Sequence, residues 1–365
     1  MNDAYPQKRR GKTGLREIAS AASVSIATAS RVLSGNSRVA PHIQKAVLEE
    51  AKKLGIDRKA KTLAFIVSNR AMLHAFHSRI LSGAEAQCTA HGWDMIFLSF
   101  NYSPHIPCSE LHLPKLIQRN DVVRAVILAG TNSANLIKVL KDKGITFVVF
   151  GNNVIGEGAD LKESDVVFAD DIQGAQDATR YLIGLGHRNI WFVGNTRLPW
   201  FARCLEGYRR AMSESGLVPR ESSTDSEDDT ESGYLGTKSL LDRDESATAI
   251  LAGNDPTAYG VYKALRDRDL RIPDDISVAG CDDTVGKWLS PALSTTREFP
   301  EQLGKELVKV VINRIATPDR DYQCVTVPTE FVKRDSCSSL RASRNEKLKV
   351  RVQEVAVTLP NTDLT

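Results

Sequence analysis

A short segment near the start of the chain carries side chains that can contact nucleic acid. Arg31 can donate two parallel hydrogen bonds to a guanine base, whereas Ile26 and Ala27 can contact only apolar groups such as a thymine methyl. Ser25 can cap a helix over residues 26–33, which would place these side chains on its first turns. We therefore expect this helix to enter the major groove of double-stranded DNA.

Two further helices must hold this helix in place. Apolar residues at helical spacing predict a helix before the break at residues 23–25, namely Leu15, Ile18, Ala19 and Ala22. A third helix is expected from Pro41, with an apolar stripe formed by Ile43, Val47, Leu48, Ala51 and Leu54. Together these segments predict a helix-turn-helix head over residues 13–55. A small three-helix module that binds another protein is the alternative.

The head is expected to contact DNA phosphates as well as bases. The hydroxyls of Thr28 and Ser30 and the N-terminus of the second helix suit phosphate oxygens. The full set of expected DNA contacts is Thr13, Ser25, Ile26, Ala27, Thr28, Ser30, Arg31 and Arg38.

The charge distribution favours DNA as the partner. Residues 1–62 contain thirteen Lys or Arg and five Asp or Glu, although the whole chain has 48 basic and 45 acidic residues. The near-neutral total therefore conceals a basic head, preceded by a basic tail at residues 1–12, on an acidic body. Such a head neutralises phosphates, so we expect its affinity for DNA to fall steeply as the salt concentration rises.

Past residue 60, short apolar segments alternate with helical ones. Apolar runs without polar alternation predict parallel strands that are covered on both faces. The expected strands are 62–67, 94–98, 125–128, 146–150, 190–193, 249–251 and 276–279. The fold class expected is therefore α plus α/β, with a three-helix head followed by doubly wound parallel sheets. Ligands of such sheets bind beyond the carboxyl ends of the strands.

Polar residues follow two of the expected strands. Asn254 comes after strand 249–251, and Asp282 comes after strand 276–279. Both can point into a cleft and bind a hydroxylated or amine-bearing ligand. Asn254 or Asp255, ahead of Pro256, can instead cap the next helix, and Asp283 can cap the next turn, so the spacing leaves ligand contact and capping open.

The stretch from Leu15 to Gly35, with its Ser-x-x-Thr-x-Ser-Arg core, resembles the head of the LacI/GalR transcription repressors. The resemblance continues to about Cys337. It implies a homodimeric regulator that binds a DNA operator. The body would have the periplasmic-binding-protein-like type I fold and would bind a small-molecule effector, with a carbohydrate expected, in a cleft between two subdomains. Asn254 and Asp282 match the family motifs that line this cleft.

The same resemblance implies the order of the domains. The head is followed by a short linker at 56–62, a body at 63–337 and an extension at 338–365. The composition changes near residues 157–164, and the family pattern places two further crossings near Pro291 and before strand 324–332. We therefore expect two subdomains with these approximate limits: 63–160 with 291–322, and 161–290 with 323–337. For residues 220–232 we expect a solvated acidic loop, and for the extension an edge strand or a disordered tail.

The predicted pocket departs from the family pattern at one position. The pocket arginine of the family normally stands three residues before Gly207, but Cys204 is found there and Arg203 comes one residue earlier. One residue is a rotation of about 100° on a helix, which puts the direction of Arg203 in doubt. Two aromatic residues often follow the first strand in the family. The expected effector contacts are Phe76, His77, Arg203, Asn254 and Asp282.

The head and the linker also depart from the family. Ser23 stands where a turn glycine is usual, and Ala29 replaces a larger apolar residue. The family's hinge helix, which inserts into the minor groove, has no room in the linker. Seven extended residues span about 23–25 Å, against about 34 Å between half-site centres. We therefore expect binding through the major groove without a central kink.

Other functional classes find little support in the sequence. No nucleophile elbow or phosphate-binding glycine loop follows a strand, and the six cysteines lack zinc spacing. No apolar run approaches the length of a membrane span, and the start lacks a signal segment. We expect a cytoplasmic regulator that is not an enzyme and needs no cofactor, metal or membrane. The alternative is an architectural or ligand-independent DNA-binding dimer whose body only dimerises.

Overall fold

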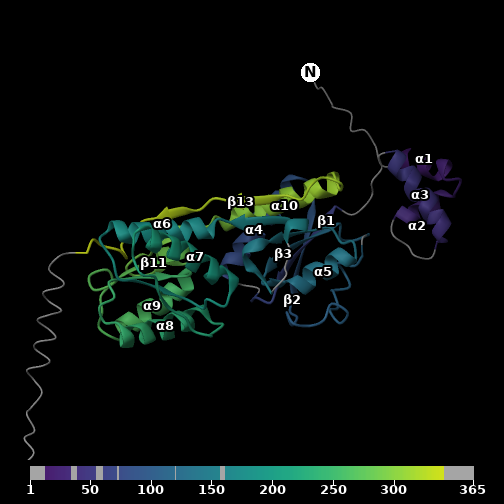
Figure 1. Cartoon of the computed structure of the whole chain (residues 1–365). Helices are drawn as coiled ribbons and strands as arrows, with labels where there is room; N and C mark the ends of the chain where they lie inside the picture. Colours follow the sequence, from purple (N-terminus) through teal and green to yellow (C-terminus); the bar gives the residue numbers. More distant parts are fainter. Residues whose placement is uncertain are drawn as a thin grey trace, which may run out of the picture.

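The computed structural model describes residues 13–33, 39–54, 61–71, 74–119, 121–156 and 161–340. The first three helices form a small bundle, α1 (Thr13–Ala21), α2 (Ile26–Leu33) and α3 (Pro41–Lys53) (Figure 1). Its core contains Ile18, Ala29 and Val47, all fully buried. Ser23 has φ 53°, so the predicted left-handed turn with a non-glycine residue is confirmed.

Strands of the body form two main sheets. The first has the order β13-β7-β5-β3-β1-β2, and all its neighbouring pairs are parallel. Its strands are β1 (Thr62–Ser68), β2 (Asp94–Phe100), β3 (Ala125–Gly130), β5 (Phe147–Phe150), β7 (Asp165–Ala169) and β13 (Cys324–Val327). Buried clusters cover both of its faces.

The second sheet has the order β14-β12-β11-β10-β8-β9 and is parallel except for the pair β12–β14. Its strands are β8 (Ile190–Val193), β9 (Arg220–Ser222), β10 (Ala249–Ala252), β11 (Ser277–Asp282), β12 (Ser294–Arg297) and β14 (Glu330–Val332). A minor parallel pair joins β4 (Asn132–Ser133) and β6 (Val154–Ile155). The strands expected from apolar runs are confirmed, whereas polar β12 carried no such signal.

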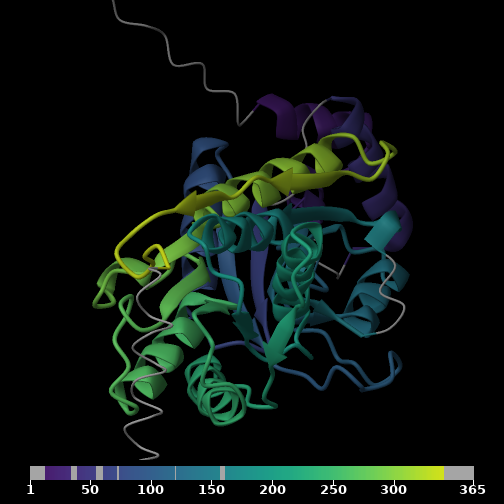
Figure 2. The same cartoon turned by 60° about the vertical axis from the view of Figure 1, so that its left-hand side comes forward.

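Helices cover both sheets. The first sheet is covered by α4 (Ala75–Ala90), α5 (Ala134–Asp142) and α10 (Pro300–Ala316). The second sheet is covered by α6 (Asp171–Gly184), α7 (Pro199–Glu214), α8 (Asp229–Arg243) and α9 (Asp255–Arg266). The described part of the body also contains three short 3-10 helices, η1 (Gly151–Asn153), η2 (Leu161–Glu163) and η3 (Gly286–Trp288). The two lobes lie side by side, with the yellow C-terminal strands running past both (Figures 1 and 2).

The chain crosses between the sheets at other points than those expected. Strand β7 pairs with β5 in the first sheet, although residues 161–290 were expected in the second subdomain. Strand β12 lies in the second sheet, and the final segment divides into β13 in the first sheet and β14 in the second. Pairing with strands distant in the sequence decides sheet membership, and local composition carries no trace of it. The crossings therefore lie after β7, after β12 and after β13.

The crossing segments are joined to one another. The amide of Asp170 donates to the carbonyl of Val327 at 3.0 Å, and the Thr329 hydroxyl donates to the Asp170 carbonyl at 3.2 Å. Such short, bonded connections between two lobes are suited to act as a hinge.

Some expectations fall outside the described residues. These are the basic tail, Arg38, nearly all of the linker and most of the extension. Residues 220–232 are not one loop, because they contain β9 and the first turn of α8. Within the described ranges, none of the helices is both long and apolar enough to cross a membrane.

Candidate functional site

The second helix of the head presents the predicted base-reading side chains to solvent. Ser25 caps α2, because its Oγ accepts a hydrogen bond from the Thr28 amide at 3.0 Å and lies 2.8 Å from the Thr28 hydroxyl. Ile26, Ala27 and Arg31 are exposed, and Ile26 keeps 47% of its surface accessible. An exposed isoleucine on the first turn of this helix can bury its apolar surface against a base edge.

The other predicted DNA contacts differ in exposure. Thr28 and Ser30 are half-buried, and Thr13 is the first residue of α1. Ala29 is fully buried between the helices, where its small side chain leaves the thin core that the sequence predicts. The head therefore offers one exposed face, formed by the start of α2.

A narrow cavity of about 50 Å³ lies between the carboxyl ends of the two sheets. Four of the five predicted effector contacts line it, namely Phe76, His77, Asn254 and Asp282. A buried water needs about 10–15 Å³, so this cavity has room for only a few waters. A sugar can therefore enter only when the two subdomains move apart.

The polar residues at the strand ends line the cavity and also bond the backbone that follows them, with Asp282 rather than the expected Asp283 in this position at the end of β11. Asn254 caps α9, since its Oδ1 accepts from the Thr257 amide at 2.9 Å, and its Nδ2 donates to Asp229 Oδ2 at 2.9 Å. Asp282 Oδ1 accepts from the amide and hydroxyl of Thr284 at 2.9 and 2.6 Å. Capping fixes these side chains at the cavity wall, so it orients them rather than excluding them from ligand contact.

His77 is held in an aromatic setting. Its ring centroid lies 5.7 Å from that of Phe76 and 6.5 Å from that of Phe150, and its Nε2 lies 3.4 Å from Asn153 Nδ2. Burial lowers the pKa of His77 well below its ordinary value, so the ring is neutral at pH 7. Its Nδ1 is buried and has no hydrogen-bond partner among the described residues. This nitrogen is therefore available to a ligand in the cavity.

Arg203 does not line the cavity, unlike the expected contact. Its Nε lies 2.8 and 3.0 Å from the two carboxylate oxygens of Asp171, and its guanidinium stacks 5.2 Å from the centre of the Phe168 ring. Cys204, one residue later on α7, lines the cavity instead. One residue along a helix is a rotation of about 100°, which explains why Cys204 lines the cavity and Arg203 does not. Arg203 therefore acts on the site through its ion pair with Asp171 and through its electrostatic attraction to Glu298, both of which line the cavity.

A contact across the cleft closes the cavity. Arg70, after β1, places its guanidinium 4.1 Å from the centre of the Trp200 ring on α7, and its Nε donates to the Thr131 hydroxyl at 3.2 Å. A guanidinium over an indole face is attracted by about 0.5–2 kcal/mol. This contact links the first lobe to the second directly over the site.

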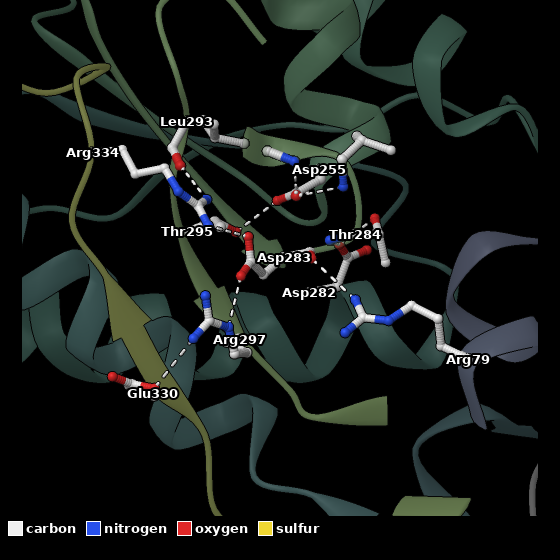
Figure 3. Close-up of polar contacts among 12 residues, drawn as sticks. Arg79, Asp255, Asp282, Asp283, Thr284, Leu293, Thr295, Arg297, Glu330 and Arg334 are labelled. Atoms are coloured by element: carbon white, nitrogen blue, oxygen red, sulfur yellow. Dashed lines mark hydrogen bonds and ion pairs between the residues drawn. The ribbon is translucent and has the colours of Figure 1, made fainter. Parts of the chain in front are cut away.

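Behind Asp282, its neighbour Asp283 joins several elements (Figure 3). Its carboxylate oxygens accept from Arg334 Nη2 at 2.6 Å and from Arg297 Nε at 2.8 Å. Its carbonyl accepts from Arg79 Nη1 of α4 at 3.3 Å, and Arg79 also pairs with Glu301 of α10 through Nε at 2.7 Å. The wall of the cavity is thus connected to a helix of the first lobe.

Burial dominates the electrostatics of the acidic side chains here. It raises the pKa of Asp282 well above its ordinary value and that of Asp171 to a smaller extent, despite the ion pair with Arg203. Burial also raises the pKa of Glu298 to about 8 and that of Asp255 to about 6. Asp255 accepts from Thr295 Oγ1 at 2.6 Å and from the Gly286 amide at 2.6 Å, so its role is structural.

Several lining residues were not predicted from the sequence. Arg70 and Asn152 follow β1 and β5 directly, and the rule that ligands bind beyond strand ends would have found them. Asp229 falls in the segment expected to be a plain acidic loop. Glu298 lies at the second crossing, after a strand that has no apolar signal. Its position depends entirely on the tertiary fold.

Similarity to known proteins agrees with both halves of this architecture. The profile of bacterial regulatory proteins of the lacI family matches residues 14–56, and that of a periplasmic binding protein-like domain matches residues 179–337. The chain belongs to the LacI family. Catabolite control protein A of Priestia megaterium is 28% identical over 334 residues, covering 88% of this chain and 98% of that protein.

Two further relatives match nearly their whole length. The ribose operon repressor of Haemophilus influenzae is 26% identical over 348 residues, covering 90% of this chain and 99% of that protein. The structure of a complex of the transcriptional regulator CelR with cellobiose has a TM-score of 0.67 at 25% identity, covering 88% of this chain and 99% of that one.

As a LacI-family member, this protein is a DNA-binding transcription regulator controlled by a small molecule and not an enzyme. Its cysteines in the described ranges are free thiols. Among the same residues, no group of three or more His, Cys, Asp or Glu side chains is arranged to hold a metal ion.

Proposed function

We propose that this LacI-family protein is a cytoplasmic, homodimeric repressor whose affinity for a two-half-site operator changes when a sugar binds between its lobes. The observation that carries the proposal is the cavity at the carboxyl ends of both sheets, which combines aromatic rings with hydrogen-bonding groups. Hydroxylated ligands require this combination. The relatives named for ribose and solved with cellobiose support a sugar as the ligand.

The cavity contacts proposed for the sugar are Phe76, His77, Asn254 and Asp282. The hydroxyls of the sugar would bind His77 Nδ1 and the side chains of Asn254 and Asp282, while Phe76 packs against an apolar face of the sugar ring. Because the cavity is narrow, binding selects a state in which the lobes are further apart than here. The ligand changes DNA affinity only if it binds the two states unequally.

The experiment that tests this function selects bound DNA from a random pool and then measures release by sugars, nucleosides and amino acids. We expect a sequence with two related half-sites, and a changed affinity with at least one sugar. A protein that recovers a DNA sequence but responds to no small molecule would instead be the ligand-independent dimer.

Base reading by Arg31 is tested on the selected sequence. Replacing Arg31 by Ala should cost about 1–3 kcal/mol of binding free energy and relax one position in each half-site, because the bidentate contact to guanine is lost. The measurement is a set of binding curves on point-mutated half-sites. Lys45→Ala, on α3, is the control for a general loss of charge. Equal weakening on every sequence would make Arg31 a phosphate contact and contradict base reading.

The short linker predicts that the operator stays nearly straight. Helix α3 ends at Lys53 and β1 begins at Thr62, so few residues separate the head from the body. A linker of this length has no room for the hinge helix of the family, so we expect no side chain to enter the minor groove and unstack a central base step. A circular-permutation gel shift should therefore show little bending. A bend comparable to that produced by a hinge-bearing relative, measured in parallel, would contradict this prediction.

A further inference from the structure

The cavity carries more acidic than basic side chains. Within the described ranges its lining includes four carboxyl groups, Asp171, Asp229, Asp282 and Glu298, and one guanidinium, that of Arg70. Arg70 lies flat on Trp200, 4.1 Å from the ring centre, so its charge is already engaged. An anionic ligand such as a sugar phosphate would therefore find no further cationic side chain to pair with among these lining residues.

The four carboxyl groups are not equally satisfied. Asp171 is paired with Arg203, with 2.6 Å between the carboxylate and Nη2, and Asp282 accepts two hydrogen bonds from Thr284. Asp229 accepts from Asn254 through one oxygen, while its Oδ1 is buried without a partner among the described residues.

Glu298 is the group that no side chain of the described residues pairs directly, although the charge of Arg203 attracts it from a distance. Its side chain receives no hydrogen bond or ion pair from the described residues, although it is only 8% exposed and lines the cavity. It lies directly after β12, at the second crossing between the lobes. Burying a carboxyl group without a partner is costly, and folded proteins rarely leave one so. An unpartnered acid facing a cavity indicates the chemistry of what enters that cavity.

We infer that the effector is an amino sugar and that its protonated amine binds the Glu298 carboxylate. The inference rests on the proposed function, because it assumes that the cavity is the effector site. Asp229 Oδ1, His74 Nδ1 and His77 Nδ1 are unpartnered polar atoms of the described lining that can bind the hydroxyl groups of the sugar. An ammonium group supplies what no side chain provides, a positive charge within hydrogen-bond distance of Glu298.

Binding should also move a proton. The raised pKa of Glu298, about 8, means that this carboxyl group is mostly protonated at pH 7 in the free protein. When an ammonium group binds, Glu298 gives up its proton to solvent and the ligand keeps its own. The complex then contains a carboxylate paired with an ammonium, and up to one proton is released for each ligand bound.

The test is titration calorimetry of the full-length protein with matched pairs: glucose and glucosamine, galactose and galactosamine, mannose and mannosamine. Glucose 6-phosphate serves as the anionic probe. We expect the amino sugar of at least one pair to bind about tenfold or more tightly than its neutral parent. Measured in two buffers of different ionisation enthalpy at pH 7, the binding heat should reveal the released proton.

The matched variant is Glu298→Gln, which keeps the shape of the side chain and removes its charge. It should abolish both the preference for the amino sugar and the proton release, while Glu245→Gln, on the exposed surface of the second lobe, should leave both unchanged. Thermal unfolding shows whether each variant is folded. Glu298→Asp, which keeps the acid, should restore part of the preference if charge pairing is its cause.

Three outcomes would overturn the inference. These are a neutral sugar that binds as tightly as its amino partner, preferred binding of glucose 6-phosphate, and no binding of any amino sugar. The proposed function fails only if, in addition, no sugar of any charge alters the affinity for the selected DNA. If a neutral sugar releases the DNA, the proposed function is supported, but the inference that the effector carries an amine is contradicted.

Discussion

Replacing Asp283 by Asn should lower the free energy of unfolding by about 3 kcal/mol, because it removes the carboxylate shared by two arginines. The side chain of Asp283 is only 7% exposed, and it accepts from Arg334 at 2.6 Å and Arg297 at 2.8 Å. The side chain of Arg334 is itself 15% exposed, so its charge cannot turn to water without moving the chain. Asn tolerates the left-handed backbone found at this residue, φ 51°. The loss of unfolding free energy is therefore due to the removed charge and not to backbone strain.

Urea unfolding at pH 7 measures this loss. The matched control is Asp225→Asn, which removes the carboxylate of a surface pair with Arg197 whose side chains are 69% and 75% exposed. That pair should contribute less than about 1 kcal/mol. A loss of the same small size for Asp283→Asn would mean that water replaces the carboxylate between the two arginines.

Replacing Glu298 by Gln should make the protein more stable at high pH. The pKa of Glu298 is about 8 in the folded protein against an ordinary value of 4.5, so the folded state binds more protons than the unfolded state between these values. The stability contributed by the protonated acid is therefore present below about pH 4.5 and is lost as the pH rises to about 8. The full loss is of the order of 3–5 kcal/mol. The Gln variant has no ionisable group at this position, so it does not show this loss of stability as the pH rises.

Other groups around Glu298 also titrate, so the comparison must be between variants. The charged or titratable groups that face it are Asp171, Arg203, Cys204, Asp255, Cys281 and Asp282. These groups remain in Glu298→Gln, and the difference between the two stability curves isolates Glu298. Denaturant unfolding from pH 5 to pH 9 should give curves that separate as the pH rises, with the variant above. Parallel curves, or a variant less stable at pH 9, would contradict the predicted burial of an unpaired acid.

These two predictions concern residues that the sequence treats very differently. Asp283 follows a recognisable strand beside a predicted pocket residue, so its neighbourhood could be anticipated although its partners could not. Arg297 and Arg334 reach it from β12 and from beyond β14, 14 and 51 residues away along the chain. Ion pairs over such separations leave no periodic pattern for a reader of the sequence to detect.

The head shows how far local information extends. Helical spacing placed α1, α2 and α3, the Ser25 cap followed from its residue type, and the left-handed Ser23 followed from the glycine that the family usually has at this turn. Each of these features depends on contacts within a few residues, where side-chain chemistry determines the backbone directly. The same reasoning found most strands of the body, and therefore Asn254 and Asp282 at the strand ends.

The sequence by itself thus determined the family, the two-part architecture, the exposed face of α2 and the two strand ends that place Asn254 and Asp282 in the cavity wall. Only the tertiary structure decided that β7 belongs to the first sheet, that Arg203 turns to Asp171, and that Glu298 faces the cavity alone. The physical reason is the range of the interactions. Helix and strand periodicity is set by neighbours in the chain, whereas sheet pairing and the burial of a charge are set by segments that meet only after folding.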